Sequence, residues 1–388
     1  MGEPFKNLLG PREVRAAALY LSRPTPRRHF DPARFEALAL DGLERLELKA
    51  RAEHIASALE ATLPAEFARA AARIEAALAP PAPATADAPP ALGDQGLAGW
   101  IVWPLGEYVA RRGLSEPTRA LRVLHALTQR FTAEWALRPF LEAHPEETFA
   151  TLRVWAGDPS AQVRRLVSEG SRPRLPWGRR LAGLVADPTP TLPLLAALQD
   201  DPSAYVRRSV ANHLNDIAQD HPEVVAGWLE AHLPDAPAAR RALLRHASRS
   251  LIKRGDTRAL RAFGLGAALR GAARLVIEPP KITLGASVTL HVTLASSARK
   301  AQDLVLDYVV HHVKANGGTS PKVFKGWTRT LGARESLSLS KRHAVRPIST
   351  RKYYPGRHRV ALQANGKVVC EAEFELEMPD GRQAAGRA

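Results

Sequence analysis

The sequence has almost no cysteine: Cys370 is the single one in 388 residues. One thiol cannot form a disulfide within the chain, and it cannot build a cysteine-based metal site. Long apolar runs are also missing, since no stretch approaches the roughly 20 residues that a membrane-spanning helix needs. The first residues, MGEPFKNLLG, lack the apolar core of a secretory signal. These absences lead us to expect a cytoplasmic protein without a membrane partner, a cofactor or a metal.

Acidic residues are fewer than basic ones. Lys and Arg number 55 against 39 Asp and Glu, which gives a formal net charge of +16. An excess of arginine favours partners that carry phosphate, above all nucleic acid. A GC-rich genome would explain arginine in place of lysine, but it would not explain the net charge. The length suggests two or three domains, and an apolar content of 45% is ordinary for a globular protein.

The middle of the chain contains an internal repeat. The block Asp-Pro-Ser-Ala-x-Val-Arg-Arg begins at Asp158 and again at Asp201, 43 residues later, and a weaker copy begins at Glu116. An acidic residue followed by Pro is a typical helix start. Helical repeats of about 40–47 residues are typical of HEAT-like solenoids. The repeat therefore predicts an α-solenoid in this part of the chain.

Polar residues at helical spacing follow the two clearest copies. Arg208, Asn212 and Asp216 recur every four residues, and we predict that they share one face of a helix. Arg165 and Glu169 occupy the matching places in the preceding copy. Stacked repeats would bring these stripes together, so that arginines, carboxylates and an amide lie on one surface.

The helical part is expected to extend over residues 1–270. Apolar periodicity predicts helices over 11–21, 41–62 and 64–78. Residues 79–91 are rich in Pro and Ala and cannot form a helix interior. We expect this segment to be a flexible loop within the helical domain, because helical patterns resume directly after it.

Beyond residue 270 the apolar residues alternate with a period of two. Alternation over 288–294 and 304–313 predicts strands, and Asn-Gly pairs mark turns between strands. About seven short strands in about 105 residues fit a β-sandwich of immunoglobulin type. The expected fold is thus a HEAT-like α-solenoid followed by an immunoglobulin-like β-sandwich over 271–378, with a disordered tail over 379–388.

Several long motifs are distinctive enough to compare with known families. They are EPFKNLL from Glu3, GLERLELKARAEHIASAL from Gly42, SEGSRPRLPW from Ser168, YVRRSVANHLNDIAQDHPE from Tyr205, SPKVFKGW from Ser320 and the segment 349–355. These motifs resemble the AlkC branch of the AlkD-like DNA alkylation-repair glycosylases, and the resemblance covers nearly the whole chain. It implies a monofunctional glycosylase that removes 3-methyladenine and 3-methylcytosine without flipping the lesion into a deep pocket. It also implies that the immunoglobulin-like domain grips DNA.

Glu169 is the strongest catalytic candidate. It precedes GSRPRLPW, in which Pro173 and Pro176 forbid a continuous helix. A carboxylate among arginines suits a glycosylase, because it can stabilise an oxocarbenium ion and position water. Spacing alone favours a surface salt bridge of Glu169 with Arg165. The resemblance implies instead that the glutamate of the SEG motif is catalytic.

Two more carboxylates and three other side chains are candidates for the same site. The resemblance implies an active-site role for Glu134, which its residue context alone would assign to an ordinary helix surface. Asp216 lies toward the C-terminal part of its helix, where a negative charge is unfavourable and slightly favours a functional role. Trp177 is expected against the lesion or the deoxyribose, through cation–π contact with the charged base, although a core position fits it equally well. Trp135 and Asn212 are the remaining candidates for such contacts.

Basic residues in both parts are candidates for contacts with the DNA backbone, which position a protein without reading sequence. They are Arg164, Arg165, Arg172, Arg174, Arg207, Arg208 and His213 in the solenoid, and Lys322, Lys325, Arg351 and Lys352 in the sandwich. We expect a monomer that binds double-stranded DNA with alkylated bases and is associated with the bacterial nucleoid. Two other hypotheses stay open: a non-catalytic DNA-binding solenoid and a protein-interaction scaffold.

Overall fold

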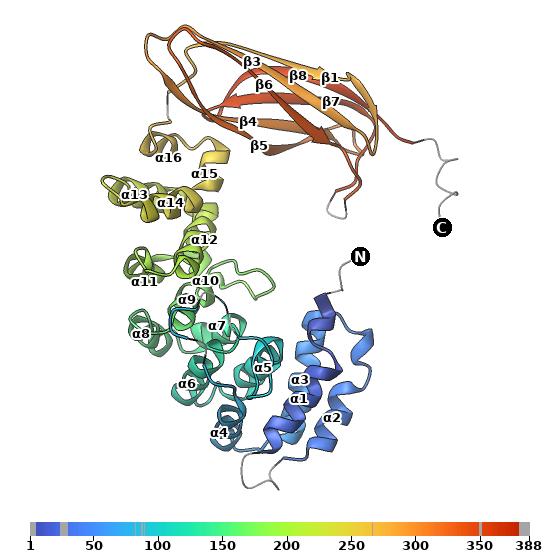
Figure 1. Cartoon of the computed structure of the whole chain (residues 1–388), viewed down its shortest axis with the longest axis vertical. Helices are drawn as coiled ribbons and strands as arrows, with labels where there is room; N and C mark the ends of the chain where they lie inside the picture. The colour runs from blue at the N-terminus through green and yellow to red at the C-terminus, as the bar shows by residue number, and fades with distance from the viewer. Residues whose placement is uncertain are drawn as a thin grey trace. The chain divides into compact units, whose positions relative to one another are not determined.

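The computed structural model describes residues 5–23, 30–81, 83–86, 88, 90–265, 267–348 and 351–379. The chain divides into two compact units: Met1–Val225 with Ala236–Ala247, and Ala226–Asp235 with Ser248–Ala388. The first unit is helical, and strands dominate the second (Figure 1). This order confirms the predicted fold class. The tail predicted over 379–388 lies, apart from residue 379, outside the described residues.

The helices of the first unit are mostly short, as expected for solenoid repeats. Their bounds are α1 Pro11–Ser22, α2 Pro32–Leu40, α3 Leu48–Thr62, α4 Phe67–Ala77, α5 Val102–Arg112, α6 Pro117–Thr128, α7 Glu134–Ala143, α8 Pro145–Trp155, α9 Ala161–Gly170, α10 Ala182–Ala186, α11 Leu192–Leu198, α12 Ala204–Asp220, α13 Pro222–His232, which crosses the division between the units, and α14 Ala238–Ala247. Turns of 3-10 helix are η1 Phe5–Leu8, η3 Leu43–Arg45, η4 Gly99–Ile101 and η5 Thr189–Thr191. None of the helices in the described part is both long enough and apolar enough to cross a bilayer.

The helices of this unit stack in two layers (Figure 1). In one layer α3, α5, α7, α9, α12 and α14 each pack against the next. In the other, α4 packs on α6 and α6 on α8. Helix pairs repeated in this way are the architecture of HEAT-like arrays. The first layer places α7, α9 and α12 in succession, so side chains from these three helices can meet.

The repeated Asp-Pro-Ser-Ala block forms the turn before a helix. The carboxylates of Asp158 and Asp201 each accept a hydrogen bond from the backbone N–H two residues on, at 2.8 and 2.9 Å. Arg164 and Arg207 fold back onto these turns and donate to the carbonyls of Asp158 and Asp201 at 2.8 and 2.5 Å. Arg164 also pairs with the Asp201 carboxylate at 2.6 Å. The block thus closes each turn and ties one repeat to the next.

Two predicted helices begin later than expected. The helix predicted over 41–62 is broken, because Gly42 adopts a left-handed conformation with φ of +67° and a 3-10 turn follows. Helix α3 begins only at Leu48. The helix predicted over 64–78 begins at Phe67. In both cases the apolar period correctly predicts the helix, but it does not reveal the turn that precedes the helix.

The Pro/Ala-rich segment 79–91 contacts the start of α9. The Ala84 carbonyl accepts a hydrogen bond from the Ala161 N–H at 2.9 Å. The Ala86 carbonyl accepts one from the side chain of Gln162, also at 2.9 Å. The segment thus satisfies one unpaired backbone N–H at the beginning of the helix that carries Glu169, and it also binds the side-chain amide of Gln162.

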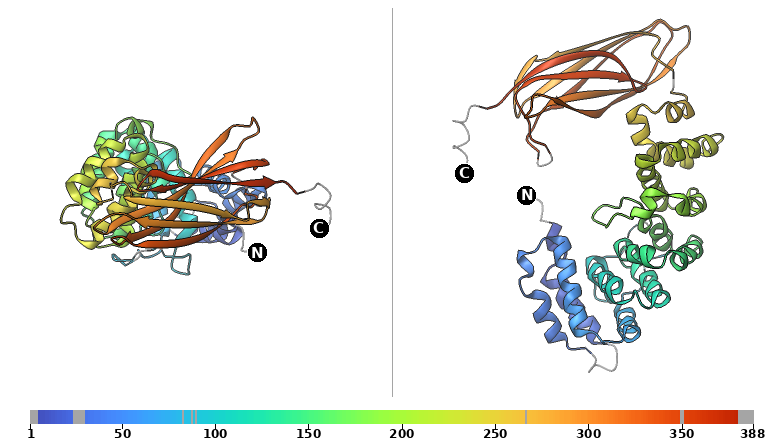
Figure 2. Two further views of the ribbon diagram at one scale, coloured as in Figure 1. Left: turned by 90° about the horizontal axis from the view of Figure 1, so that it is seen from above. Right: turned by 180° about the vertical axis from the view of Figure 1, so that it is seen from behind.

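The strands of the second unit form two facing sheets (Figure 2). They are β1 Gly271–Glu278, β2 Lys281–Thr283, β3 Ser287–Ser296, β4 Gln302–Val313, β5 Thr319–Leu331, β6 Ser336–Ala344, β7 Gly356–Ala364 and β8 Lys367–Glu377. The sheet orders are β1-β3-β6 and β2-β8-β7-β4-β5, and all pairs are antiparallel except β2 with β8. Alternate residues such as Val288, Leu290 and Val292 fill the core between the sheets.

Two helices belong to the same unit as the sandwich: α15 Arg249–Arg254 and α16 Thr257–Ala262. Ile252 and Leu260 pack with Leu265 and Val305 of β4 in one small apolar cluster. The unit therefore begins before the boundary predicted at residue 270. The change of apolar period near residue 270 marks where the strands begin. The compact unit also includes the two preceding helices, because their apolar residues pack against β4.

Candidate active site

Helix α9 carries the centre of the site. Arg165 and Glu169 lie one turn apart and point away from the apolar face of the helix. The helix ends at Gly170, directly after Glu169. A Cβ atom on Gly170 would lie 2.5 Å from Leu137 of α7, so glycine is what lets α7 approach α9 this closely. The approach brings side chains of α7 within reach of Arg165.

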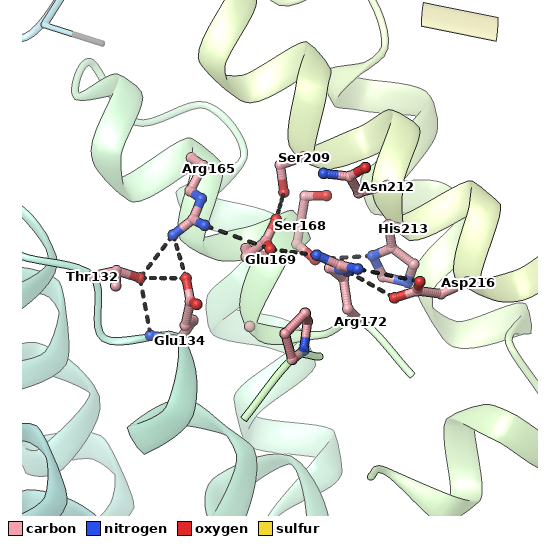
Figure 3. Close-up of polar contacts among 12 residues, drawn as sticks. Thr132, Glu134, Arg165, Ser168, Glu169, Arg172, Ser209, Asn212, His213 and Asp216 are labelled. Atoms are coloured by element: carbon pink, nitrogen blue, oxygen red, sulfur yellow. Dashed lines mark hydrogen bonds and ion pairs between the residues drawn. The ribbon is translucent and has the colours of Figure 1, made fainter. Parts of the chain in front are cut away.

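Five charged side chains form an unbroken row of alternating sign (Figure 3). The row runs Glu134, Arg165, Glu169, Arg172, Asp216, and we call it the carboxylate–arginine row. Arg165 hydrogen-bonds Glu134, and its second nitrogen lies 3.5 Å from Glu169 Oε1. Arg172 donates to Glu169 Oε1 at 2.5 Å and to the two Asp216 oxygens at 2.7 and 3.2 Å. The three carboxylates predicted for the site are therefore brought together.

The row is nearly shielded from water. Glu134, Glu169 and Asp216 are 7%, 6% and 4% exposed. Burial opposes ionisation of Glu169, but Arg165, Arg172 and a hydrogen bond from Ser209 outweigh it and hold the pKa of Glu169 below its ordinary value. With every member ionised, three carboxylates and two guanidinium groups leave one net negative charge. In a dry environment this charge interacts strongly with any positive charge placed beside it.

Two hydroxyl groups complete the hydrogen bonds of the glutamates. Ser209 Oγ donates to Glu169 Oε2 at 2.6 Å. Thr132 Oγ1 donates to Glu134 Oε2 at 2.6 Å and accepts from Arg165 at 2.7 Å. Neither residue stands out in the sequence. A serine in a polar helix face gives no charge signal, and Thr132 lies outside the repeated block.

Helix α12 meets α9 through a face one residue away from the predicted stripe. We predicted that Arg208, Asn212 and Asp216 share a face, whereas Ser209, His213 and Asp216 turn toward α9 (Figure 3). A spacing of four drifts around a helix of 3.6 residues per turn. Two turns of helix correspond to about 7.2 residues. The residue that lies on the same face as Asp216 two turns earlier is therefore Ser209 and not Arg208.

His213 connects α12 to α9 inside the protein. It is completely buried, and its Nδ1–H donates to the Ser168 carbonyl at 2.9 Å. Burial lowers the pKa of His213 to about 3, so the ring is neutral at physiological pH. A neutral ring without exposed surface cannot bind phosphate. The prediction that His213 contacts DNA is therefore wrong.

Four arginines predicted to contact DNA bind groups within the protein. Arg165 and Arg172 lie in the row, with side chains only 14% and 8% exposed. Arg164 binds the Asp201 carboxylate through two nitrogens and uses the third for carbonyl groups. Arg207 donates to two carbonyls of its own turn. The sequence showed the positive charges, but it could not show that carboxylates and turn carbonyls already occupy them.

Arg174 and Arg208 remain on the surface of the first unit. Arg174 pairs with Asp220 through two contacts of 2.7 Å. Arg208 is exposed, and among the described residues it has no hydrogen-bond or ion-pair partner. Asn212 is half-buried, with its side-chain oxygen 3.0 Å from His246 Nε2.

The predicted basic residues of the second unit lie beside aromatic rings. Lys322 and Lys325 are on β5, the edge strand of the five-stranded sheet. The Lys322 ammonium lies 5.6 Å from the ring of Phe324. Arg351 and Lys352 lie over Tyr353 and Tyr354 at 5.9 and 5.6 Å. Lysines on an edge strand can also serve to prevent edge-to-edge pairing with another sheet. The contact of these four residues with DNA therefore stays a prediction.

Three tryptophans lie near one end of the row. Trp103 stacks on Trp135 of α7 with ring centres 4.2 Å apart, and the ring of Trp177 is parallel to that of Trp103 at 6.3 Å. Trp177 is 58% exposed, which rules out the alternative of a core position. Its backbone has a φ of +61°, in the left-handed region that side chains other than glycine rarely adopt. A large aromatic surface is thus presented to solvent from a constrained position.

Within the described residues, His, Cys, Asp and Glu side chains form no group of three or more that could hold a metal ion. The three carboxylates of the row illustrate why. Arg165 and Arg172 stand between them and take the places that a cation would occupy.

The chain is similar to proteins found in three comparisons. Residues 271–378 match the family model described as uncharacterised protein YhaZ, C-terminal Ig-like domain. The uncharacterized protein YhaZ of Bacillus subtilis (strain 168) is 34% identical over 353 residues, which cover 89% of this chain and 92% of that protein. The Pseudomonas fluorescens alkylpurine DNA glycosylase AlkC, solved bound to DNA containing an abasic site analog, aligns with a TM-score of 0.86 and 36% identity. That alignment covers 97% of this chain and 100% of AlkC.

Proposed function

This chain belongs to the family of YhaZ and AlkC, and on that premise we propose that it is a monofunctional DNA glycosylase. It hydrolyses the N-glycosidic bond of cationic alkylated bases, such as 3-methyladenine and 3-methylcytosine, and leaves an abasic site for base excision repair. The observation that carries the proposal is the carboxylate–arginine row, which offers one net negative charge in a nearly dry environment.

The proposed reaction needs little more than a stabilised positive charge. As the bond from C1′ to the base nitrogen breaks, its electron pair moves to the base and neutralises the charge on the methylated ring. The sugar becomes an oxocarbenium ion, which a water molecule attacks at C1′. As the new C–O bond forms, the water gives a proton to the nearby carboxylate, which passes it on to solvent. Because the leaving base is already cationic, no strong general acid is required. A fixed carboxylate near C1′ stabilises the ion and orients the water.

Glu169 is proposed to act on the sugar and the water, because it occupies the middle of the row. Its hydrogen bonds to Arg172 and Ser209 fix both carboxylate oxygens. Glu134 and Asp216 add negative charge on either side. Arg165 and Arg172 are proposed as positioning residues, since they pair with the carboxylates of the row. The low pKa of Glu169 keeps it charged throughout the physiological range.

Trp177, Trp135 and Asn212 are proposed to contact the lesion or its deoxyribose. The exposed face of Trp177 suits a cationic base through cation–π attraction. The carboxylates keep a small exposed edge at the protein surface, which suits a sugar brought to them by bending of the duplex. We therefore propose that the lesion need not enter a deep pocket.

The partner is double-stranded DNA that carries alkylated bases, and the protein acts as a monomer. Arg208, which is exposed, is proposed to contact the DNA backbone, and Arg174 joins it if it exchanges Asp220 for phosphate. In the immunoglobulin-like domain the proposed contacts are Lys322, Lys325, Arg351 and Lys352. Such contacts position the enzyme on any sequence, which suits a search for scattered damage.

A substitution of the central carboxylate tests the proposed function. We expect the wild-type protein to release methylated base from a duplex containing 3-methyladenine or 3-methylcytosine, in EDTA and at physiological salt. Glu169→Gln should lower the single-turnover rate on the order of 1000-fold, with little change in affinity for a duplex containing an abasic site analogue. Released base is measured by chromatography.

Glu75→Gln is the matched control. Glu75 also pairs with an arginine, Arg119, on a helix of the same unit, but it lies outside the row. We expect this variant to excise at the wild-type rate. Excision by Glu169→Gln near the wild-type rate would remove Glu169 from catalysis. A wild-type protein that binds DNA but releases no base would favour the non-catalytic solenoid instead.

A further inference from the structure

The segment between α9 and α10, residues 171–181, which we call the proline loop, cannot satisfy its own carbonyl groups. Pro173 and Pro176 lack a backbone N–H. Within the loop the Leu181 N–H reaches the Pro173 carbonyl and the Gly178 N–H reaches the Leu175 carbonyl, both at 3.2 Å. Buried carbonyls that remain need donors from outside the loop.

Arg138 of α7 supplies most of those donors. Its Nε donates to the Arg179 carbonyl at 2.7 Å, and its Nη1 donates to the carbonyls of Gly170 and Arg172 at 2.9 and 2.7 Å. Its Nη2 lies 3.5 Å from the Pro173 carbonyl. A guanidinium group has five N–H donors and no acceptor, which matches a loop that is rich in acceptors. One side chain thus joins the beginning of the loop to a residue near its end.

The position of Arg138 is unusual for a charged residue. It is completely buried, and no carboxylate among the described residues pairs with it. Burial lowers its pKa to about 10, so it remains protonated at physiological pH. Burying a charge is costly, and the backbone carbonyls compensate it together with the charges of Glu142, Asp216 and Glu134 nearby. That cost argues for a specific role.

Two neighbours complete the attachment of the loop to α7. The indole N–H of Trp135 donates to the Pro176 carbonyl at 3.2 Å. A Cβ atom on Gly178 would lie 3.3 Å from both Arg138 Cδ and Trp135 Cδ1, so glycine allows the loop to lie directly on these two side chains. Glu134, one turn before Arg138, belongs to the row. Helix α7 therefore carries both a carboxylate of the site and the attachment of the loop.

The loop in turn delivers two of the side chains that the proposed function uses. Arg172 bridges Glu169 and Asp216, and Trp177 presents its ring from a left-handed backbone conformation. Neither geometry is available to a loop that moves freely. We propose that Arg138 is a positioning residue that fixes the proline loop, and through it both Arg172 and Trp177. The kinetic part of this inference rests on the proposed glycosylase function, whereas the structural part does not.

The test compares two buried arginines. Arg138→Met keeps an unbranched apolar chain but removes every donor. We expect the single-turnover excision rate to fall on the order of 100-fold, as for a misplaced catalytic group, while affinity for undamaged duplex DNA stays near the wild-type value. Trypsin should also cut faster after Arg174, Arg179 and Arg180, as mapped by mass spectrometry of the intact chain.

Arg51→Met is the matched control, because Arg51 is also buried and binds only backbone carbonyls. It donates to those of Lys6, Leu9, Glu44 and Leu46. We expect it to lower the melting temperature about as much as Arg138→Met does, with unchanged excision and unchanged cleavage in the proline loop. Equal loss of excision in both variants would reduce Arg138 to a general stabilising role and overturn the inference.

Arg138→Lys is a second variant that keeps the test possible if Arg138→Met does not fold. It keeps the charge but has one nitrogen in place of three, so we expect an excision rate and a trypsin sensitivity between those of wild type and Arg138→Met. Wild-type behaviour of Arg138→Lys in both assays would contradict the inference. If the wild-type protein excises nothing, the proposed function fails. Cleavage in the proline loop then decides by itself whether Arg138 holds the loop.

Discussion

Single residues decide how the three carboxylates can lie beside one another. Arg165 and Arg172 stand between Glu134, Glu169 and Asp216, and they hold the pKa of Glu169 below its ordinary value in spite of its burial. The positions of the carboxylates could be predicted from the repeat and from the resemblance. The neutral donors could not, because Ser209 and Thr132 resemble any other polar residue in the sequence. Their contribution follows from distances that only the packed helices define.

Ser209→Ala removes one hydrogen bond from the charged form of Glu169. The lost bond should raise the pKa of Glu169, since Ser209 helps to hold it below its ordinary value. The proposed mechanism requires the ionised carboxylate, so the rate should fall as pH drops through this pKa. We expect the acid limb of the single-turnover rate to move upward by about one pH unit, equivalent to about 1.4 kcal/mol.

Thr148→Val provides the comparison for Ser209→Ala. Thr148 is a buried hydroxyl that donates to the Phe140 carbonyl at 3.0 Å rather than to a carboxylate. Its removal should leave the acid limb in place. An acid limb that does not move in Ser209→Ala, or one that moves as far in Thr148→Val, would contradict the role assigned to Ser209.

At the scale of elements, the repeated block builds the turns that precede helices α9 and α12. Its period correctly predicted helices stacked in a solenoid. Its arginines were harder to interpret, because a sequence does not show which charges are already neutralised. Arg164 lies between the carbonyls of its own turn and the Asp201 carboxylate of the next copy, whereas Arg208 is exposed. The first arginine of each block, Arg164 or Arg207, donates to carbonyls of its own turn. The second lies in the carboxylate–arginine row as Arg165 or is exposed as Arg208.

Arg164→Ala and Arg208→Ala should separate stability from DNA binding. Arg164→Ala leaves Asp201, which is buried, without its partner, and should lower the free energy of unfolding by about 3 kcal/mol. Arg208→Ala should change stability by less than about 0.5 kcal/mol. It should weaken DNA binding and reduce the salt dependence of affinity by about one charge. Denaturant unfolding and DNA titrations at several salt concentrations measure both. Loss of DNA affinity with unchanged stability in Arg164→Ala would contradict this division.

At the scale of the whole molecule, the net charge of the chain and the net charge of the row have opposite signs. The chain carries a net charge of +16, yet the row at the centre of the site has one net negative charge. The basic excess therefore lies elsewhere, on surfaces that can attract DNA over several ångströms. The fold class was predictable because helical and strand periods change sharply near residue 270. The start of the second compact unit before residue 270 could not be predicted, because it depends on the packing of α15 and α16 against β4.

Release of a cationic base compared with a neutral one tests the central claim most directly. Two duplexes of the same sequence would carry 3-methylcytosine or uracil at one position, and base release would be followed under single-turnover conditions in EDTA. A negatively charged row without a strong general acid predicts that 3-methylcytosine is released and that uracil is not released above the uncatalysed background. Release of both bases at similar rates would contradict the account, since it would require a proton donor that acts on the neutral leaving base.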